Sequence, residues 1–185
     1  MTLKISKLVK SVGPIEASLS KYRRLAKEFL EPDPEATRQS GKSRRITLND
    51  GFKLFLGDKM VGHHGFRVAE AKTVLTELWP WFEREGLLPE KSRKHKPREK
   101  DVFWEIFIVP KTTEIGFYYK AEGTIGAMKS AKEPGFKNVM QKKIIHESPV
   151  AQRIGSAFDR DEYKVRVLRI TTLSREFQIA TRDLR

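Results

Sequence analysis

The spacing of the apolar residues changes once along this chain, and that change limits the folds open to it. Before about residue 87 apolar side chains recur every three to four residues, as on a helix, whereas after about residue 101 they alternate, as on a strand. Between these stretches, residues 87–101 contain two prolines and six basic residues from Lys91 to Lys100. The sequence therefore predicts an α+β protein with a helical domain over residues 1–86, a basic linker over 87–101 and a β-rich domain over 102–185.

Four helices are expected in the N-terminal domain. The first two are short and are separated by Gly13 and Pro14, which makes them a helix-turn-helix candidate. Their apolar faces contain Leu3, Ile5, Leu8 and Val9, and then Ile15, Leu19, Tyr22, Leu25 and Phe29. A third helix is expected to begin with Thr47 as N-cap and Asp50 completing a capping box, and to break at residues 62–65. The fourth is expected from about Val68 to Phe82.

An irregular basic segment separates the second and third expected helices. Residues 31–45, EPDPEATRQSGKSRR, contain prolines first, then Ser40-Gly41, and three basic residues in the last four positions. Proline and glycine interrupt regular structure, so this segment is expected to form an exposed loop or wing beside the second helix.

The C-terminal domain is expected to be a small, mostly antiparallel sheet. Residues 102–109 and 115–121 are rich in β-branched and aromatic residues and flank a turn at Pro110–Glu114, so they predict a hairpin. Three further strands are expected around Lys142–His146, over Glu162–Thr171 and over Glu176–Ala180, and a short helix over Ser148–Phe158.

The chain is strongly basic, and most of the excess positive charge lies in its first part. It has 37 Lys and Arg against 24 Asp and Glu, a net charge of +13. Residues 1–100 hold 22 of the basic and 13 of the acidic side chains. Such an excess favours a polyanionic partner, with a merely solvated basic surface as the alternative.

Several classes of function are not expected from this sequence. It has no cysteine, which excludes disulfides and thiolate sites. The adjacent His63 and His64 cannot share one helix face, so no metal site is expected. No other cofactor is expected either. Asp101, Glu105, Glu114 and Lys120 lack the spacing of a nuclease site, and no enzyme is expected. With no signal peptide or membrane span in the sequence, we expect no membrane partner and a cytoplasmic location.

The first 85 residues resemble the winged-helix DNA-binding domain of MerR-type transcriptional regulators. The resemblance rests on the first helix and turn (ISKLVKSVG, 5–13), on Ser18-Leu19, Tyr22 and Arg24, on Ser40-Gly41 and Arg45 to Asp50, and on GFRVAEA (65–71). Three features depart from the family. Ser20-Lys21 replaces an Arg-Tyr pair that contacts DNA in the family, Ile46 replaces the wing aromatic, and no long heptad helix follows Trp81. The family's usual dimer and promoter untwisting are therefore not implied, whereas a phage-type regulator or excisionase is compatible.

The resemblance and the charge together predict a regulator or architectural factor that docks the second helix and the wing on duplex DNA. The expected DNA-binding residues are Ser18, Ser20, Lys21, Tyr22, Arg23, Arg24, Lys42, Arg44 and Arg45. The C-terminal domain is then expected to form a homodimer or to bind a protein partner or an effector. Two alternatives are an RNA- or ribosome-associated module that binds through its aromatic hairpin, and a structural protein that neutralises packaged nucleic acid.

Overall fold

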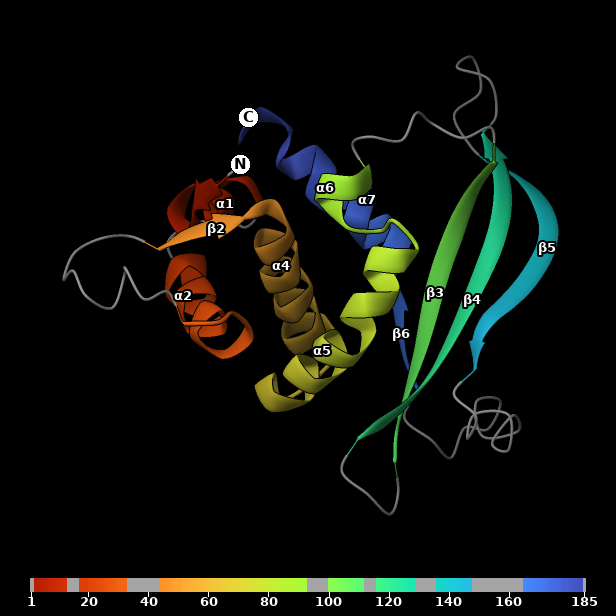
Figure 1. Ribbon diagram of the computed structural model, residues 1–185, viewed down its shortest axis with the longest axis horizontal. Helices are drawn as coiled ribbons and strands as arrows, with labels where there is room; N and C mark the ends of the chain where they lie inside the picture. Colours follow the sequence, from red (N-terminus) through yellow and green to blue (C-terminus); the bar gives the residue numbers. More distant parts are fainter. Residues whose placement is uncertain are drawn as a thin grey trace. The chain divides into compact units, whose positions relative to one another are not determined.

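The computed structural model describes residues 2–12, 17–32, 44–92, 100–111, 116–128, 136–147 and 165–184. The chain forms two compact units, one of Met1–Lys94 with Ser174–Arg185 and one of His95–Leu173 (Figure 1). The α+β class predicted from the sequence is confirmed. The segment from Ser174 onward, however, belongs to the first unit and not to a C-terminal β domain.

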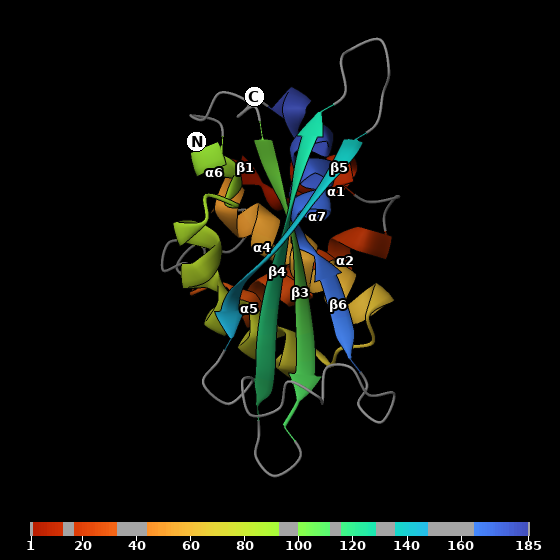
Figure 2. The ribbon, with the colours of Figure 1, turned by 90° about the vertical axis from the view of Figure 1, so that its right-hand side faces the viewer.

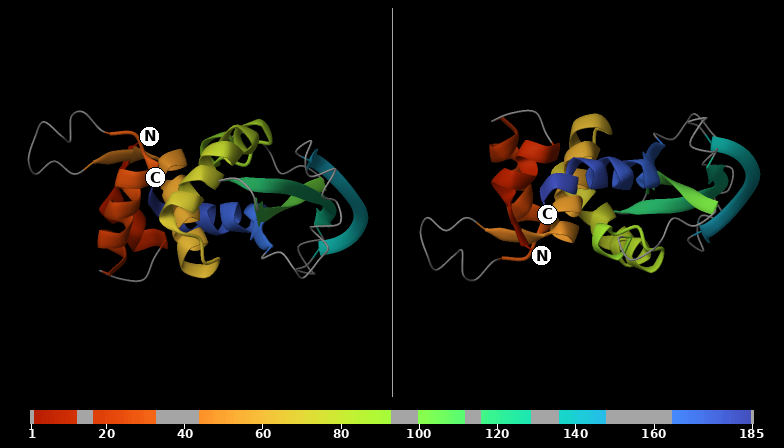
Figure 3. Two further views of the ribbon diagram at one scale, coloured as in Figure 1. Left: turned by 90° about the horizontal axis from the view of Figure 1, so that it is seen from below. Right: turned by 90° about the horizontal axis from the view of Figure 1, so that it is seen from above.

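The first unit is built mainly from helices. Its elements are β1 (Thr2–Lys4), α1 (Ile5–Val12), α2 (Ala17–Phe29), β2 (Arg45–Thr47), α4 (Leu48–His63), α5 (Val68–Arg84), α6 (Pro89–Ser92), the C-terminal part of α7 (Ile170–Ala180) and the 3₁₀ helix η1 (Arg182–Leu184). Helix α1 contacts η1, so the first and last described segments lie side by side (Figure 3).

Strands β1 and β2 form a two-stranded antiparallel sheet in which Leu3 lies opposite Ile46. Both of these side chains are buried. The assignment of Leu3 to the first helix was therefore wrong, because a partner more than forty positions away holds it in a strand. The helix itself begins two residues later, at Ile5.

The capping box predicted for the third helix is confirmed. The Thr47 hydroxyl accepts from the Asp50 backbone N–H at 3.0 Å, and the Asp50 carboxylate accepts from the Thr47 N–H at 2.9 Å. These two bonds satisfy donors that the first turn of a helix leaves unpaired. They fix where α4 begins, directly after β2.

The C-terminal segment is a helix where the sequence predicted a strand over Glu176–Ala180. Ile170, Ser174, Phe177 and Thr181 are buried and recur every three to four residues, which is the period of a helix. Phe177 is fully buried against the rings of Phe52 and Phe55. Burial of this ring explains why the segment belongs to the first unit.

The two ends of the predicted linker belong to the folded units. Leu87 and Leu88 are 9% and 2% exposed, and Leu87 accepts a hydrogen bond from the Ser174 hydroxyl at 3.1 Å. These residues belong to the core of the first unit because they are apolar and reach a buried partner. The strand β3 already begins at Lys100. Residues 93–99 lie outside the described residues.

The second unit contains an antiparallel sheet of four strands in the order β5-β4-β3-β6, seen face-on in Figure 2. The strands are β3 (Lys100–Pro110), β4 (Phe117–Met128), β5 (Phe136–Glu147) and β6 (Arg166–Arg169). The predicted hairpin is confirmed by the pairing of β3 with β4, and the strand expected around residues 142–146 by β5. The helix expected over 148–158 lies outside the described residues.

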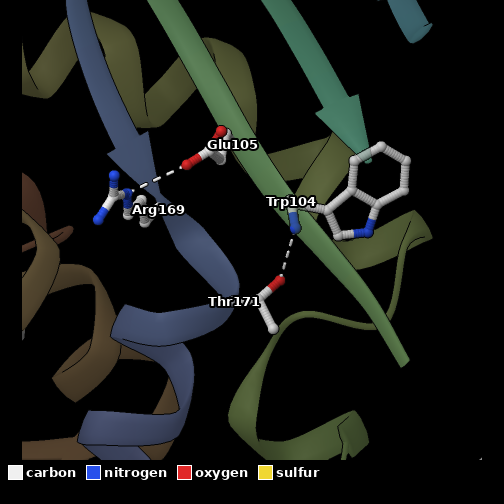
Figure 4. A network of polar contacts seen from close by, with 4 residues as sticks. All are labelled: Trp104, Glu105, Arg169 and Thr171. Atoms are coloured by element: carbon white, nitrogen blue, oxygen red, sulfur yellow. Dashed lines mark hydrogen bonds and ion pairs between the residues drawn. The ribbon is translucent and has the colours of Figure 1, made fainter. Parts of the chain in front are cut away.

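Polar contacts join β6 and the start of α7 to the edge of β3 (Figure 4). The Arg169 guanidinium lies 3.1 Å from the Glu105 carboxylate. The Thr171 hydroxyl accepts from the Trp104 N–H at 2.9 Å and donates to the Val102 carbonyl at 3.3 Å. A threonine side chain thus replaces the backbone partner that β3 loses where β6 ends.

Candidate nucleic-acid interface

Helix α2 has one apolar face and one basic face. Its apolar residues Tyr22, Leu25, Ala26 and Phe29 are buried. Its exposed residues Ser20, Arg23, Arg24 and Lys27 are three or four positions apart, so they lie together on the opposite side. We call these four residues the α2 face. Exposed Glu28 is the one acidic residue among positions 20–29.

Lys27 lies on the α2 face although it was not among the expected DNA-binding residues. It follows Arg23 by four positions and Arg24 by three, so helical spacing alone would have added it to the expected DNA-binding residues. Ser18 lies in the first turn of α2, but its side chain is outside the described part of the structure.

Tyr22 does not lie on the α2 face. Its side chain is 1% exposed, and burial, with the charge of Asp58 as a second cause, raises the pKa of its hydroxyl. The assignment of Tyr22 as a DNA-binding residue was therefore wrong. Its place in the apolar spacing of the helix already indicated this position in the core.

Lys21 lies at the border between the two faces of α2. Its ammonium group forms an ion pair with Asp58 of α4, and its side chain is 37% exposed. The ion pair directs the Lys21 ammonium toward α4 and not toward the exposed side of α2. We therefore leave Lys21 out of the α2 face.

Arg44 stabilises the end of α2. Its guanidinium donates to the Ala26 carbonyl at 3.3 Å and to the carbonyl of Glu31. Carbonyls at the C-terminal end of a helix carry partial negative charge, so a guanidinium there is favourable. The Ala26 carbonyl also accepts from the Leu30 N–H at 3.3 Å, and a carbonyl oxygen has two lone pairs, so it can accept from both donors. This contact places the base of the predicted wing against the end of α2.

Replacing Arg44 by alanine is expected to lower the free energy of unfolding by about 1–3 kcal/mol, because it removes charge-assisted hydrogen bonds to backbone carbonyls. Denaturant unfolding followed by circular dichroism measures the change. Arg24→Ala, on the exposed face, serves as the matched control and is expected to stay within about 0.5 kcal/mol of wild type. Equal effects of the two substitutions would contradict the structural role of Arg44.

Of the other two predicted wing residues, the structure describes Arg45 but not Lys42. Arg45 is exposed at the start of β2. Lys42 lies outside the described residues, as does Ser40-Gly41. Arg45 directly follows Arg44, whose side chain contacts the end of α2.

A pocket of about 320 Å³ lies beside this contact, but its charges are mixed. It is lined by Phe29, Leu30, Glu31, Arg44, Asp50 and Lys53. Burial lowers the pKa of Lys53, while Asp50 and Glu31 act in the opposite direction. The Lys53 ammonium also lies 5.3 Å from the Trp79 ring centroid. With two carboxylates in its wall, this pocket is a poor site for a phosphate.

The aromatic hairpin has fewer exposed groups that could bind a nucleic acid than the α2 face has. Trp104 and Tyr119 are buried, whereas Phe103 and Phe107 are half-buried on the face of β3 that also carries Glu105. Glu105 lies opposite Glu122 across β3 and β4. Each of these carboxylates is paired with a cation, Glu105 with Arg169 and Glu122 with Lys120, so these groups give the face no excess positive charge to attract a polyanion.

The candidate catalytic groups of the hairpin are engaged in ion pairs. Glu105 pairs with Arg169, and Lys120 pairs with Glu122 at 3.0 Å. Glu114 and the side chain of Asp101 lie outside the described part. Among the described residues, no group of three or more His, Asp or Glu side chains has a geometry that could hold a metal ion. Nor is any helix in the described ranges both long and apolar enough to cross a bilayer.

Comparison of the chain with models of protein families, with curated proteins and with solved structures finds no match.

Proposed function

We propose that the first unit is a winged helix-turn-helix domain that binds duplex DNA, and that the protein acts as a regulator or architectural factor. The α2 face enters the major groove, and Arg45 contacts the backbone beside it. The observation that supports this proposal is the exposed cluster of Arg23, Arg24 and Lys27 on a helix whose opposite side is buried.

The dimensions of α2 suit the major groove. A helix with its side chains is about 10–12 Å across, and the major groove of B-DNA is about 12 Å wide. Arginine forks bind the O6 and N7 atoms of guanine or two phosphate oxygens, and the Ser20 hydroxyl can donate to or accept from a base edge. Arg23 and Arg24 therefore supply both base and backbone contacts.

Competition between duplex DNA and single-stranded RNA tests this proposal against the alternative of an RNA-binding module. The whole chain is bound to labelled duplex at low salt, and unlabelled RNA or DNA is added. We expect unlabelled duplex to displace the labelled duplex at a lower concentration than RNA does. The substitution Phe107→Ala should leave both of these competitor concentrations unchanged. Preference for RNA that is lost in Phe107→Ala would overturn the proposal.

A further inference from the structure

A second group of basic residues lies on β1, β2 and α1. Lys4 and Arg45 are opposite each other in the two-stranded sheet, and both are exposed. Lys7 and Lys10, also exposed, follow at intervals of three positions on α1. We call these four residues the β1–α1 surface. Only Arg45 was among the residues expected to bind DNA.

The pairing of Lys4 with Arg45 puts two like charges side by side. Residues directly opposite in an antiparallel pair project to the same face, with Cβ atoms about 4.5–5.5 Å apart. Their neighbours Leu3 and Ile46 are buried on the other face, so the two cations point outward. Like charges in this arrangement destabilise a sheet. The pair therefore costs stability unless an anion lies between the two groups.

No anion of the protein supplies this neutralisation in the part of the chain that the structure describes. Lys4 and Arg45 form no ion pair with any described carboxylate, and α1 has no acidic residue. By contrast, Lys21 and Lys59 of the same unit are each paired with an acidic side chain. The charges of Lys4 and Arg45 are thus not neutralised by an ion pair in the described ranges.

We propose that the β1–α1 surface binds the phosphodiester backbone of the duplex, with Lys4 and Arg45 holding one phosphate between them. The guanidinium fork and the compact ammonium both donate to phosphate oxygens, and a phosphate removes their mutual repulsion. Lys7 and Lys10 contact the backbone that continues along α1. The inference depends on the proposed function, and it assigns Lys4, Lys7 and Lys10 as backbone contacts that add affinity without reading sequence.

The salt dependence of duplex binding by the whole chain tests this inference. Each neutralised phosphate contributes about 0.9 to the slope of log affinity against log salt. Lys4→Ala/Arg45→Ala removes both side chains that hold one phosphate, so it should reduce the slope by about 0.9. The control Lys72→Ala/Arg84→Ala removes two exposed charges from α5 and is expected to leave the slope near that of wild type.

Charge reversal at Lys4 separates binding from folding. Lys4→Glu places a carboxylate opposite Arg45, so at low salt its denaturation midpoint should exceed that of wild type while its affinity for duplex falls. Lys72→Glu is the control for long-range repulsion. If wild type binds and Lys4→Glu weakens binding no more than Lys72→Glu, this inference is overturned and the proposed function stands. If wild type does not bind duplex at all, both are overturned.

Discussion

Replacing Phe177 by alanine is expected to lower the free energy of unfolding of the first unit by about 3–5 kcal/mol, the largest stability effect we predict. The ring is fully buried, with centroids 5.3 Å from Phe52 and 5.5 Å from Phe55. It also lies close to the backbone of α4, since a Cβ added at Gly51 would come within 3.3 Å of the Phe177 ring. Alanine would leave a cavity that this close packing cannot easily fill.

Ile179 provides the control within the same helix. Its side chain is 76% exposed, so Ile179→Ala is expected to change stability by no more than about 0.5 kcal/mol. Denaturant unfolding of both variants, followed by the helical circular dichroism signal, measures the difference. Similar losses at Phe177 and Ile179 would contradict the assignment of the C-terminal segment to the first unit.

The largest effect on binding is expected from the triple substitution Arg23→Ala/Arg24→Ala/Lys27→Ala. If each side chain contacts a phosphate, the slope of log affinity against log salt falls by about 2.7. These residues are exposed, so stability should change little. The measurement is fluorescence anisotropy of a labelled duplex between about 50 and 200 mM salt.

The control for this triple variant removes the same charge from another helix. Arg67, Lys72 and Arg84 are all exposed at or along α5. Their replacement by alanine lowers long-range attraction to the same extent but removes no proposed contact. A triple variant of α2 that binds as well as this control would show that the α2 face is not the interface.

Local signals in the sequence predicted much of the fold. The Thr47 and Asp50 capping box is a contact between residues three positions apart, and the burial of Leu8 and Val9 follows from helical spacing. The hairpin of β3 and β4 is likewise short-range, since its strands are separated by a single turn. In each case the residues that decide the structure are neighbours along the chain.

The remaining features depend on contacts between distant residues. Leu3 lies in a strand because Ile46 pairs with it, and Phe177 lies in a helix of the first unit because Phe52 and Phe55 surround its ring. Arg44 is held by the carbonyls of Ala26 and Glu31, and Lys21 pairs with Asp58. No local pattern contains these partners. Helical spacing therefore placed Arg23, Arg24 and Lys27 on an exposed face, but the sequence did not indicate that Arg44 and Lys21 are held by other parts of the first unit.

Direct binding of the whole wild-type chain to a short duplex, measured across salt concentrations, tests the central claim. We predict binding at low salt, with log affinity falling linearly against log salt at a slope of magnitude about 2.7 or more, from at least three phosphate contacts. Absence of binding at low salt, or an affinity that does not depend on salt, would contradict it.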